Sequence, residues 1–370
     1  MAPRVPVPKG PTPLPANATI GILGGGQLGR MTALAAAPLG YRCHIYDPDA
    51  AGGPAAQVSD AATSAAWDDW PALDAFAAAV DVVTYEFENV PVDTVDYLMK
   101  RVPVRPGPQA LDVAQHRVAE KTFARDQGLE TAHFWGVTTL DELIEGLAAV
   151  GVPSILKTCR LGYDGKGQIR VDMDTSLSKI WEDLGTDDAI LERMVPFTTE
   201  ISVIAARGLD GTVVCFPITE NAHEGGILRR STVPAQIPEA VAAAARNVAE
   251  TLIAALDIVG LLAVELFVTE EGEVLVNEMA PRPHNSGHWT QNGCATSQFE
   301  QFVRAVVGLP LGPTDLLSET EMLNLIGDDI DAVPGHFADP KAHVHLYGKA
   351  EARPGRKMGH VNRRLSPRRG

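Results

Sequence analysis

Two apolar stretches near residue 270 each carry one carboxylate, and they constrain the fold more than any other feature of the sequence. Ala263–Val268 contains Glu265, and Glu273–Asn277 leads directly into Glu278. A short acidic turn ending in glycine separates them, so the two stretches are expected to form a β-hairpin. A buried carboxylate is costly unless it is paired or bound to metal, and two side by side repel each other. The pair, with Asn277 beside it, predicts a Mg²⁺ site that also binds substrate phosphates; the alternative is two acids that face solvent.

The loop after the second acidic strand concentrates polar side chains, and Met279–Thr290 reads MAPRPHNSGHWT. An arginine can bind an oxyanion through two parallel N–H groups, and a neighbouring histidine and asparagine can orient a small planar anion. A serine in the same loop is expected to contact a phosphate. The candidate anion-binding residues are Arg282, His284, Asn285 and Ser286. An ordinary surface loop is the alternative.

A first glycine cluster, Gly24–Gly29, follows the apolar stretch Thr19–Leu23 and precedes an alanine-rich helix. Its G-x-G-x-x-G pattern suits an anion, because glycines allow close backbone approach and the helix N-terminus is positive. Asp47 ends the next strand, where a dinucleotide site places an acid. An NAD-dependent dehydrogenase is therefore an alternative, although nothing downstream resembles hydride-transfer machinery. The same turn suits the phosphate of a sugar phosphate.

A second glycine cluster, Gly162–Gln168, reads GYDGKGQ and lies between two predicted strands, shortly after Lys157. Backbone N–H groups and lysines in such a loop fit a lid over a triphosphate. It is not a Walker A loop, and an ordinary hairpin is the alternative. Farther on, Glu192–Val195 ends another predicted strand. In a nucleotide-binding enzyme this position suits an adenine clamp, with the carboxylate on the ribose hydroxyls.

The basic segment Lys349–His360 contrasts with the rest of the chain, whose net charge is 31 − 47 = −16. One interpretation is a phosphate pocket built partly by Lys349 and Arg356, and the other is a solvated tail. The overall acidity argues against a general nucleic-acid binder. No apolar run is long enough to span a membrane, and the N-terminus has no signal-peptide pattern. Four scattered cysteines without a CxxC pair fit a reducing cytoplasm.

Four parts of the chain are predicted. Residues 1–18, rich in proline, are expected to be a disordered tail. Residues 19–113 alternate strands and helices, which predicts a Rossmann-like α/β domain with a parallel sheet. Residues 114–197 form a linker helix and a small α+β lid module. Residues 198–370 form a C-terminal domain with long strands, including Val213–Thr219, and a basic end.

Five segments in matching order resemble the N5-carboxyaminoimidazole ribonucleotide synthetase family of ATP-grasp ligases. They are GGGQLGRM (24–31), YEFENVP (85–91), GYDGKGQ (162–168), NEMAPRPHNSGHWT (277–290) and RPGRKMGH (353–360). The resemblance implies a three-domain ATP-grasp fold of mixed α/β and α+β type, with an N-terminal Rossmann-like (pre-ATP-grasp) domain. It implies that ATP, bicarbonate and 5-aminoimidazole ribonucleotide give N5-carboxyaminoimidazole ribonucleotide, ADP and phosphate, through carboxyphosphate, in purine biosynthesis. It further implies a cytoplasmic homodimer whose product passes to a mutase, with no nucleic-acid or membrane partner.

The resemblance also implies functional residues. ATP is expected to contact Arg117, Lys157, Gly162, Tyr163, Asp164, Gly165, Lys166, Gly167, Gln168, Glu192, Arg193, Met194, Val195, Glu200, His223, Asn277 and Glu278. Mg²⁺, or Mn²⁺ in its place, is expected on Glu265 and Glu278. Ribonucleotide and bicarbonate are expected at Gly26, Gln27, Leu28, Glu86, Tyr163, Asp164, Arg282, His284, Asn285, Ser286, Lys349 and Arg356. The expected catalytic residues are Asp164, Lys166, Arg282, His284 and Asn285, with Asp164 acting on the substrate amine.

Two further alternatives concern the activity: another ATP-grasp ligase, and a nucleotide-binding subunit without catalysis. The C-terminal segment motivates the second. Members of the family usually continue for some tens of residues beyond Gly359–Asn362, so the last strands and helix of the C-terminal domain are expected to be missing or replaced.

Overall fold

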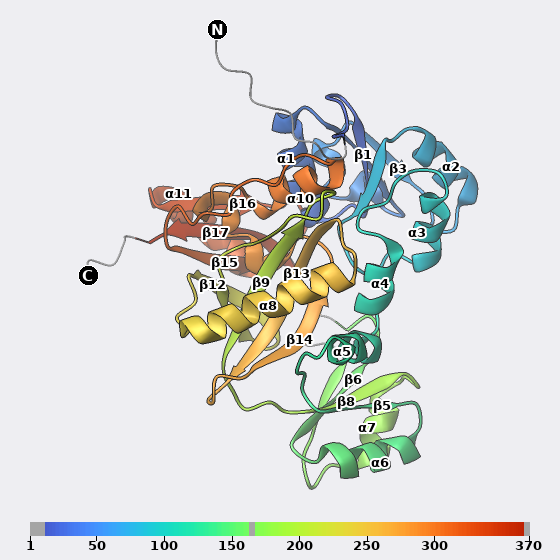
Figure 1. Cartoon of the computed structure of the whole chain (residues 1–370), viewed down its shortest axis with the longest axis vertical. Helices are drawn as coiled ribbons and strands as arrows, with labels where there is room; N and C mark the ends of the chain where they lie inside the picture. The colour runs from blue at the N-terminus through green and yellow to red at the C-terminus, as the bar shows by residue number, and fades with distance from the viewer. Residues whose placement is uncertain (1–11, 163–166, 366–370) are drawn as a thin grey trace.

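The computed structural model describes residues 12–162 and 167–365. Three sheets organise this part of the chain, one in each predicted domain. Figure 1 shows the N-terminal domain beside the large C-terminal sheet, with the small lid domain below helix α5. The first of these sheets is parallel and the other two are antiparallel, so the fold has the predicted mixed α/β and α+β type.

The N-terminal sheet has the strand order β3-β2-β1-β4 and is parallel throughout. Its strands are β1 (Thr19–Leu23), β2 (Arg42–Asp47), β3 (Ala61–Ser64) and β4 (Val82–Tyr85). The helices of this part are α1 (Gln27–Ala36), α2 (Trp70–Ala78), α3 (Val92–Met99) and α4 (Pro108–Ala114). Strand β1 is buried along its whole length, as expected for a parallel strand covered on both faces.

The tail prediction is wrong for residues 12–18. The backbone N–H of Leu14 donates to Val307 O at 2.9 Å, and the hydroxyl of Tyr41 donates to Leu14 O at 2.9 Å. Ala18 is buried and belongs to the same apolar core as β1. Proline content suggested disorder, but these contacts with distant parts of the chain order the segment. Residues 1–11 lie outside the described part.

The lid is an antiparallel sheet of order β5-β8-β6-β7 covered by two helices. Its elements are β5 (Phe134–Val137), α6 (Leu140–Val150), β6 (Ser154–Thr158), β7 (Gln168–Val171), α7 (Leu177–Leu184) and β8 (Ala189–Arg193). Their apolar side chains form a separate core. Helix α5 (Arg117–Asp126) connects this lid to the N-terminal domain and packs against β14.

The C-terminal sheet has nine antiparallel strands in the order β14-β13-β9-β11-β12-β15-β17-β16, with β10 paired to β9. Its strands are β9 (Phe197–Arg207), β10 (Val213–Cys215), β11 (Thr219–Glu224), β12 (Ile227–Val233), β13 (Gly260–Thr269), β14 (Val274–Ala280), β15 (Thr320–Ile326), β16 (Ala342–Leu346) and β17 (Lys357–Arg364). The predicted single strand over Val213–Thr219 is wrong, because β10 ends at Cys215 and β11 begins at Thr219.

Helices cover the two faces of this sheet. Helix α8 (Glu239–Ala255) packs on the face that presents Ile201 and Val203, and α10 (Gln298–Val307) packs on the face that presents Ile204. Two short helices, α9 (Thr290–Gly293) and α11 (Val333–Ala338), complete the domain. Helix α10 also contacts α1, which joins the first domain to the sheet. Within the described residues, no helix combines the length and apolarity that crossing a membrane requires.

Candidate active site

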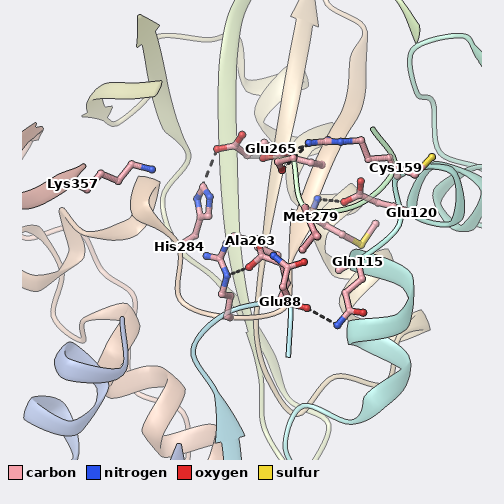
Figure 2. A pocket seen from close by; sticks show the side chains of 17 residues that line it. Glu88, Gln115, Glu120, Cys159, Ala263, Glu265, Met279, His284 and Lys357 are labelled. Carbon is pink, nitrogen blue, oxygen red and sulfur yellow. Dashed lines mark hydrogen bonds and ion pairs between the residues drawn. The ribbon is translucent and has the colours of Figure 1, made fainter. Parts of the chain in front are cut away.

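A pocket lies where the N-terminal domain, the lid and the C-terminal sheet meet (Figure 2). Its walls come from the loop after β4, the α4–α5 junction, the end of β6, strands β13 and β14, and the start of β17. The lining residues are Glu88, Asn89, Ala114, Gln115, Arg117, Glu120, Cys159, Leu161, Gly162, Ala263, Glu265, Glu278, Met279, Ala280, Arg282, His284 and Lys357.

The predicted hairpin brings the two carboxylates together. Glu265 on β13 is the cross-strand partner of Glu278 on β14, and a β-bulge places Asn277 outside the regular register. Burial raises the pKa of Glu265 to about 7, with a further contribution from the charge of Glu278. Arg117 donates to Glu278 Oε2 at 3.3 Å. Two adjoining carboxylate oxygen donors suit a hard divalent cation such as Mg²⁺.

The predicted anion-binding loop also lines the pocket, through Arg282 and His284. Arg282 forms an ion pair with Glu88, and its Nη1 donates to Pro283 O at 3.0 Å. Burial lowers the pKa of His284 to about 3, with help from the charges of Arg282 and Lys357, so the imidazole is neutral. Neither the amide oxygen nor the amide nitrogen of the buried Asn285 has a hydrogen-bond partner among the described residues. Such an unpaired buried amide suits a bound ligand.

Ser286 is hydrogen-bonded inside the protein. Its side chain is fully buried, and its hydroxyl hydrogen-bonds Ser202 at 2.8 Å and His284 Nδ1 at 2.9 Å. It lies in a short helical turn, Asn285–Gly287, which directs the hydroxyl beneath the histidine. Ser286 does not line the pocket, and the prediction that it contacts a phosphate or substrate stays a prediction.

Glu192 lies among positive charges at the lid side of the site. Lys157 Nζ donates to Glu192 Oε2 at 2.8 Å, and Lys121 Nζ lies 3.6 Å from Oε1. Burial acts to raise the pKa of Glu192, but the charges of both lysines outweigh it and lower the pKa to about 2. Lys121 also donates to Asn277 O at 2.9 Å, which links this cluster to the bulge beside Glu278.

The rest of the predicted adenine clamp borders a second hollow between lid and sheet. Arg193, Met194 and Val195 line it together with residues of the β13–β14 hairpin. Two further predicted nucleotide residues, Glu200 and His223, form an ion pair across β9 and β11. Burial acts to lower the pKa of His223, but its hydrogen bond to Glu200 and the nearby carboxylates raise it overall.

Glu86 occupies the N-terminus of α1, where the sequence predicted an external anion. The backbone N–H groups of Gly26 and Gly29 both donate to its carboxylate. A Cβ at Gly26 would lie 2.4 Å from Glu86 Oε1, so only glycine leaves room for this contact. These two N–H groups thus bind a carboxylate of the protein itself. Gln27 begins the helix, and the buried Leu28 packs in an apolar cluster.

Asp47 also serves the glycine turn. Its Oδ2 accepts a hydrogen bond from Gly25 N at 3.1 Å, and its Oδ1 accepts one from Asp49 N at 2.8 Å. Asp47, which suggested a contact with a dinucleotide ribose, therefore hydrogen-bonds the backbone of the turn.

The two basic residues of the predicted phosphate pocket contact main-chain oxygens. Lys349 Nζ donates to Lys357 O at 2.8 Å, and Arg356 Nη1 donates to Glu351 O at 3.0 Å. Both lie outside the lining of the pocket in Figure 2, whereas Lys357 belongs to it. The basic segment thus contributes Lys357 to the pocket lining, whereas the sequence analysis had selected Lys349.

Four predicted loop residues, Tyr163, Asp164, Gly165 and Lys166, lie outside the described part of the chain. On either side of them, Gly162 O accepts a hydrogen bond from Arg117 at 3.2 Å, and Gln168 pairs with Lys157 in the lid sheet. Gly167 has a φ of +68°, and its carbonyl oxygen accepts a hydrogen bond from Thr158 N at 2.9 Å.

Sequence reasoning missed several residues of the site: Glu88, Gln115, Glu120, Lys121 and Lys357. Glu88 stands in the YEFENVP segment, two residues after Glu86, so that motif contained a signal. Burial and Glu278 raise the pKa of Glu120 to about 8. Glu120 and Lys121 are buried on the amphipathic helix α5, where the apolar periodicity carried no indication that polar residues face the site.

Three family models match consecutive parts of the chain. The ribonucleotide synthetase preATP-grasp domain matches residues 17–115, and the ATP-grasp domain matches residues 122–299. The phosphoribosylaminoimidazole carboxylase C-terminal domain matches residues 320–366. No part of this pattern corresponds to a dehydrogenase, so that alternative is set aside.

Curated and solved proteins agree with these matches. The chain is 53% identical over 359 residues to the N5-carboxyaminoimidazole ribonucleotide synthase of Brucella melitensis, covering 96% of this chain and 99% of that protein. That relative therefore lacks the further tens of residues expected beyond the aligned region. A crystal structure of an N5-carboxyaminoimidazole ribonucleotide synthetase in complex with ADP superposes with a TM-score of 0.92 at 43% identity, covering 95% of this chain and 94% of that one.

An Aspergillus clavatus N5-carboxyaminoimidazole synthase, solved with ADP and 5-aminoimidazole ribonucleotide, superposes with a TM-score of 0.86 at 31% identity, covering 94% of each chain. Sequence identity, coverage and fold all lead to one assignment. The chain belongs to the N5-carboxyaminoimidazole ribonucleotide synthase family of ATP-grasp enzymes.

Proposed function

We propose that the chain uses ATP and bicarbonate to carboxylate 5-aminoimidazole ribonucleotide, giving N5-carboxyaminoimidazole ribonucleotide, ADP and phosphate in purine biosynthesis. Family membership supports the ATP-dependent carboxylation. The observation that carries the bicarbonate step is the pocket itself. It combines the carboxylate pair Glu265 and Glu278 with Arg282 and His284 of the loop after β14. Asn285, the next residue of that loop, is buried and has an unpaired amide.

Glu265 and Glu278 are the proposed ligands of Mg²⁺, with Mn²⁺ as a substitute. The two residues are cross-strand partners, and burial together with the charge of Glu278 raises the pKa of Glu265, so an unneutralised pair is electrostatically unfavourable here. Bound between protein and nucleotide, the ion would offset phosphate charge and orient the γ-phosphoryl group. Arg117, which already contacts Glu278, would contribute positive charge to the same region.

The anion loop is proposed to bind bicarbonate. Arg282 is oriented by Glu88 and offers its remaining N–H groups to an oxyanion. The neutral His284 would donate a hydrogen bond without adding a charge, and Asn285 would orient the planar anion. A bicarbonate oxygen would attack the γ-phosphorus as ADP leaves, forming carboxyphosphate. Carboxyphosphate would then release CO₂ and phosphate, and the substrate amine would capture the CO₂.

The remaining predicted residues are assigned by resemblance. Lys157, Glu192 and the segment Arg193–Val195 are proposed for ATP, together with Glu200, His223 and Asn277. Asp164 and Lys166 are proposed to act on the substrate amine and the γ-phosphate, respectively. Ribonucleotide binding is proposed at the Gly26–Leu28 turn and Glu86, and near Tyr163, Lys349 and Arg356. Closure of the lid would exclude water from the intermediate.

We also propose that the enzyme acts in the cytoplasm as a homodimer and that its product passes to a mutase. These assignments rest on the resemblance of the five sequence segments to the family.

The experiment that tests the activity is ADP release, measured with each substrate omitted in turn. Turnover is expected only when ATP, bicarbonate and 5-aminoimidazole ribonucleotide are all present, and the product must carry carbon from labelled bicarbonate. A folded sample that releases ADP without incorporating labelled carbon would contradict the proposal.

A further inference from the structure

A line of buried polar side chains crosses three neighbouring strands of the large sheet and ends at His284. Ser231 Oγ on β12 donates to Asn221 Oδ1 on β11 at 2.8 Å, and Asn221 Nδ2 donates to Ser202 Oγ on β9 at 3.0 Å. Ser202 Oγ then donates to Ser286 Oγ at 2.8 Å, and Ser286 Oγ lies 2.9 Å from His284 Nδ1. These contacts form one continuous chain beneath the pocket.

The sheet register explains how this series of hydrogen bonds forms. Asn221 is the cross-strand partner of Ser231, and Ser202 lies on the strand that pairs with the other edge of β11. Ser202, Asn221, Ser231 and Ser286 are between 0 and 7% exposed. Buried hydroxyl and amide groups are costly to desolvate unless every one is hydrogen-bonded. Apolar side chains would pack there without that requirement. The buried hydrogen bonds therefore suggest that these polar side chains orient a neighbouring group.

The donor and acceptor roles in this series of hydrogen bonds are determined at its His284 end. The backbone N–H of Ser286 also points at His284 Nδ1, at 3.3 Å, and a backbone N–H can only donate. Nδ1 is therefore an acceptor. An accepting Nδ1 carries no proton, so the ring has a single N–H and that proton is on Nε2. Glu265 Oε1 lies 3.8 Å from Nδ1, beyond hydrogen-bonding distance, and does not compete for this atom.

We propose that Ser286, Ser202, Asn221 and Ser231 are positioning residues that hold His284 as the neutral Nε2–H tautomer. His284 lines the pocket, and with Nδ1 occupied by the buried chain, Nε2–H is the group left to donate to a bound oxyanion. The other tautomer would present a lone pair to an anion and repel it. The identity of that oxyanion as bicarbonate rests on the proposed function, whereas the tautomer itself does not.

Nitrogen-15 NMR of the histidine-labelled protein, without substrates, tests the tautomer directly. The His284 signals are assigned by their loss in His284→Gln. In the wild type, Nδ1 is expected to give the signal of an unprotonated ring nitrogen and Nε2 that of a protonated one. In Ser202→Ala, which interrupts the chain, both signals are expected to move toward each other as the tautomers mix. A protonated Nδ1 in the wild type, or unmoved signals in Ser202→Ala, would overturn the proposal.

A second variant guards against loss of folding in the first. Asn221→Asp keeps the size of the side chain but replaces its donating NH₂ with an oxygen. The hydroxyl of Ser202 is then drawn toward the new carboxylate rather than toward Ser286, and the same mixing of the His284 signals is expected. Ser154→Ala is the matched control, because Ser154 is a fully buried serine of the lid whose hydroxyl has no partner among the described residues. Its His284 signals should equal those of the wild type, and a shift of equal size there would also overturn the proposal.

Steady-state kinetics test the tautomer of His284 separately from the proposed binding of bicarbonate. Ser202→Ala is expected to lower kcat/KM for bicarbonate about tenfold, the equivalent of one buried hydrogen bond, and to leave KM for ATP unchanged. If the tautomer is as proposed but the protein incorporates no labelled bicarbonate, the proposed function fails and the tautomer assignment stands. An unchanged kcat/KM together with mixed tautomers would refute the role of the Nε2–H group in binding the oxyanion.

Discussion

Glu265 and Glu278 face each other directly across the β13–β14 hairpin, and the pKa of Glu265 is raised to about 7 by burial and by the charge of its partner. A proton and the proposed divalent cation would therefore compete for the same carboxylate. A bound metal ion would relieve the repulsion between the two carboxylates.

This competition predicts a pH-dependent metal affinity. The apparent affinity for Mn²⁺, measured by electron paramagnetic resonance in the presence of ADP, should be constant above about pH 8 and fall by up to about tenfold per pH unit below about pH 7. Glu265→Gln should bind Mn²⁺ weakly and lose this dependence. Glu270→Gln, in the turn of the same hairpin, is the control and should behave as the wild type does. A wild-type affinity independent of pH between about pH 6 and 8 would contradict the assignment.

The ion pair between Arg282 and Glu88 predicts a loss of both stability and anion binding. Glu88→Gln removes the charge that orients the buried guanidinium, so the free energy of unfolding should fall by about 2 kcal/mol and KM for bicarbonate should rise. Urea denaturation and steady-state kinetics measure the two effects. Asp74→Asn, which breaks the more exposed pair with Arg101, should cost much less, because solvent screens that pair. Equal losses in the two variants would argue against a special role for Glu88.

Replacement of Gly26 predicts a selective loss of ribonucleotide binding. A Cβ at this position would meet Glu86 Oε1 at 2.4 Å, so Gly26→Ala must displace the carboxylate that caps α1. KM for 5-aminoimidazole ribonucleotide should rise, while KM for ATP should change little. A Cβ at Gly107 would meet nothing within 4 Å, and Gly107→Ala serves as the control. If Gly26→Ala has the kinetic constants of the wild type, Glu86 does not shape the ribonucleotide site.

Glu192 predicts a contribution to stability that depends on pH. Its pKa in the folded protein is lowered to about 2 because Lys121 and Lys157 outweigh the effect of burial. A depressed carboxyl pKa stabilises the folded state above the unfolded pKa near 4.5, and this stabilisation is lost as the pH falls toward 2. The difference in unfolding free energy between wild type and Glu192→Gln should therefore be constant at neutral pH and shrink in acid. A difference that grows on acidification would have the wrong sign.

Much of the fold follows from the sequence because it depends on local patterns. The apolar run at β1, the glycine turn after it and the acidic hairpin around Glu265 each have a periodicity or turn that specifies an element. The split between β10 and β11 was missed because both strands pair with β9, and only the short segment 216–218, which contains Pro217, interrupts them. The order of residues 12–18 was missed because it depends on contacts with residues far along the chain.

Site residues are predictable from the sequence only where polar or charged residues are concentrated in one segment. Arg282 and His284 are conspicuous in a dense polar loop, and both line the pocket. Lys357 was missed in favour of its basic neighbours, because a charge count does not say which side chain points inward. The hydrogen bond of Ser286 could not be predicted for the converse reason: its partner, Ser202, lies 84 positions away in the sequence. Such a contact follows from sheet register rather than from any local motif.

The fate of bicarbonate oxygen tests the central claim most directly. If a bicarbonate oxygen attacks the γ-phosphate, turnover with ¹⁸O-labelled bicarbonate must transfer one labelled oxygen to the inorganic phosphate that is released. The account predicts this transfer in the complete reaction, in proportion to the carboxylated product formed. Phosphate without label, released while labelled carbon enters the product, would contradict the activation of bicarbonate at this site.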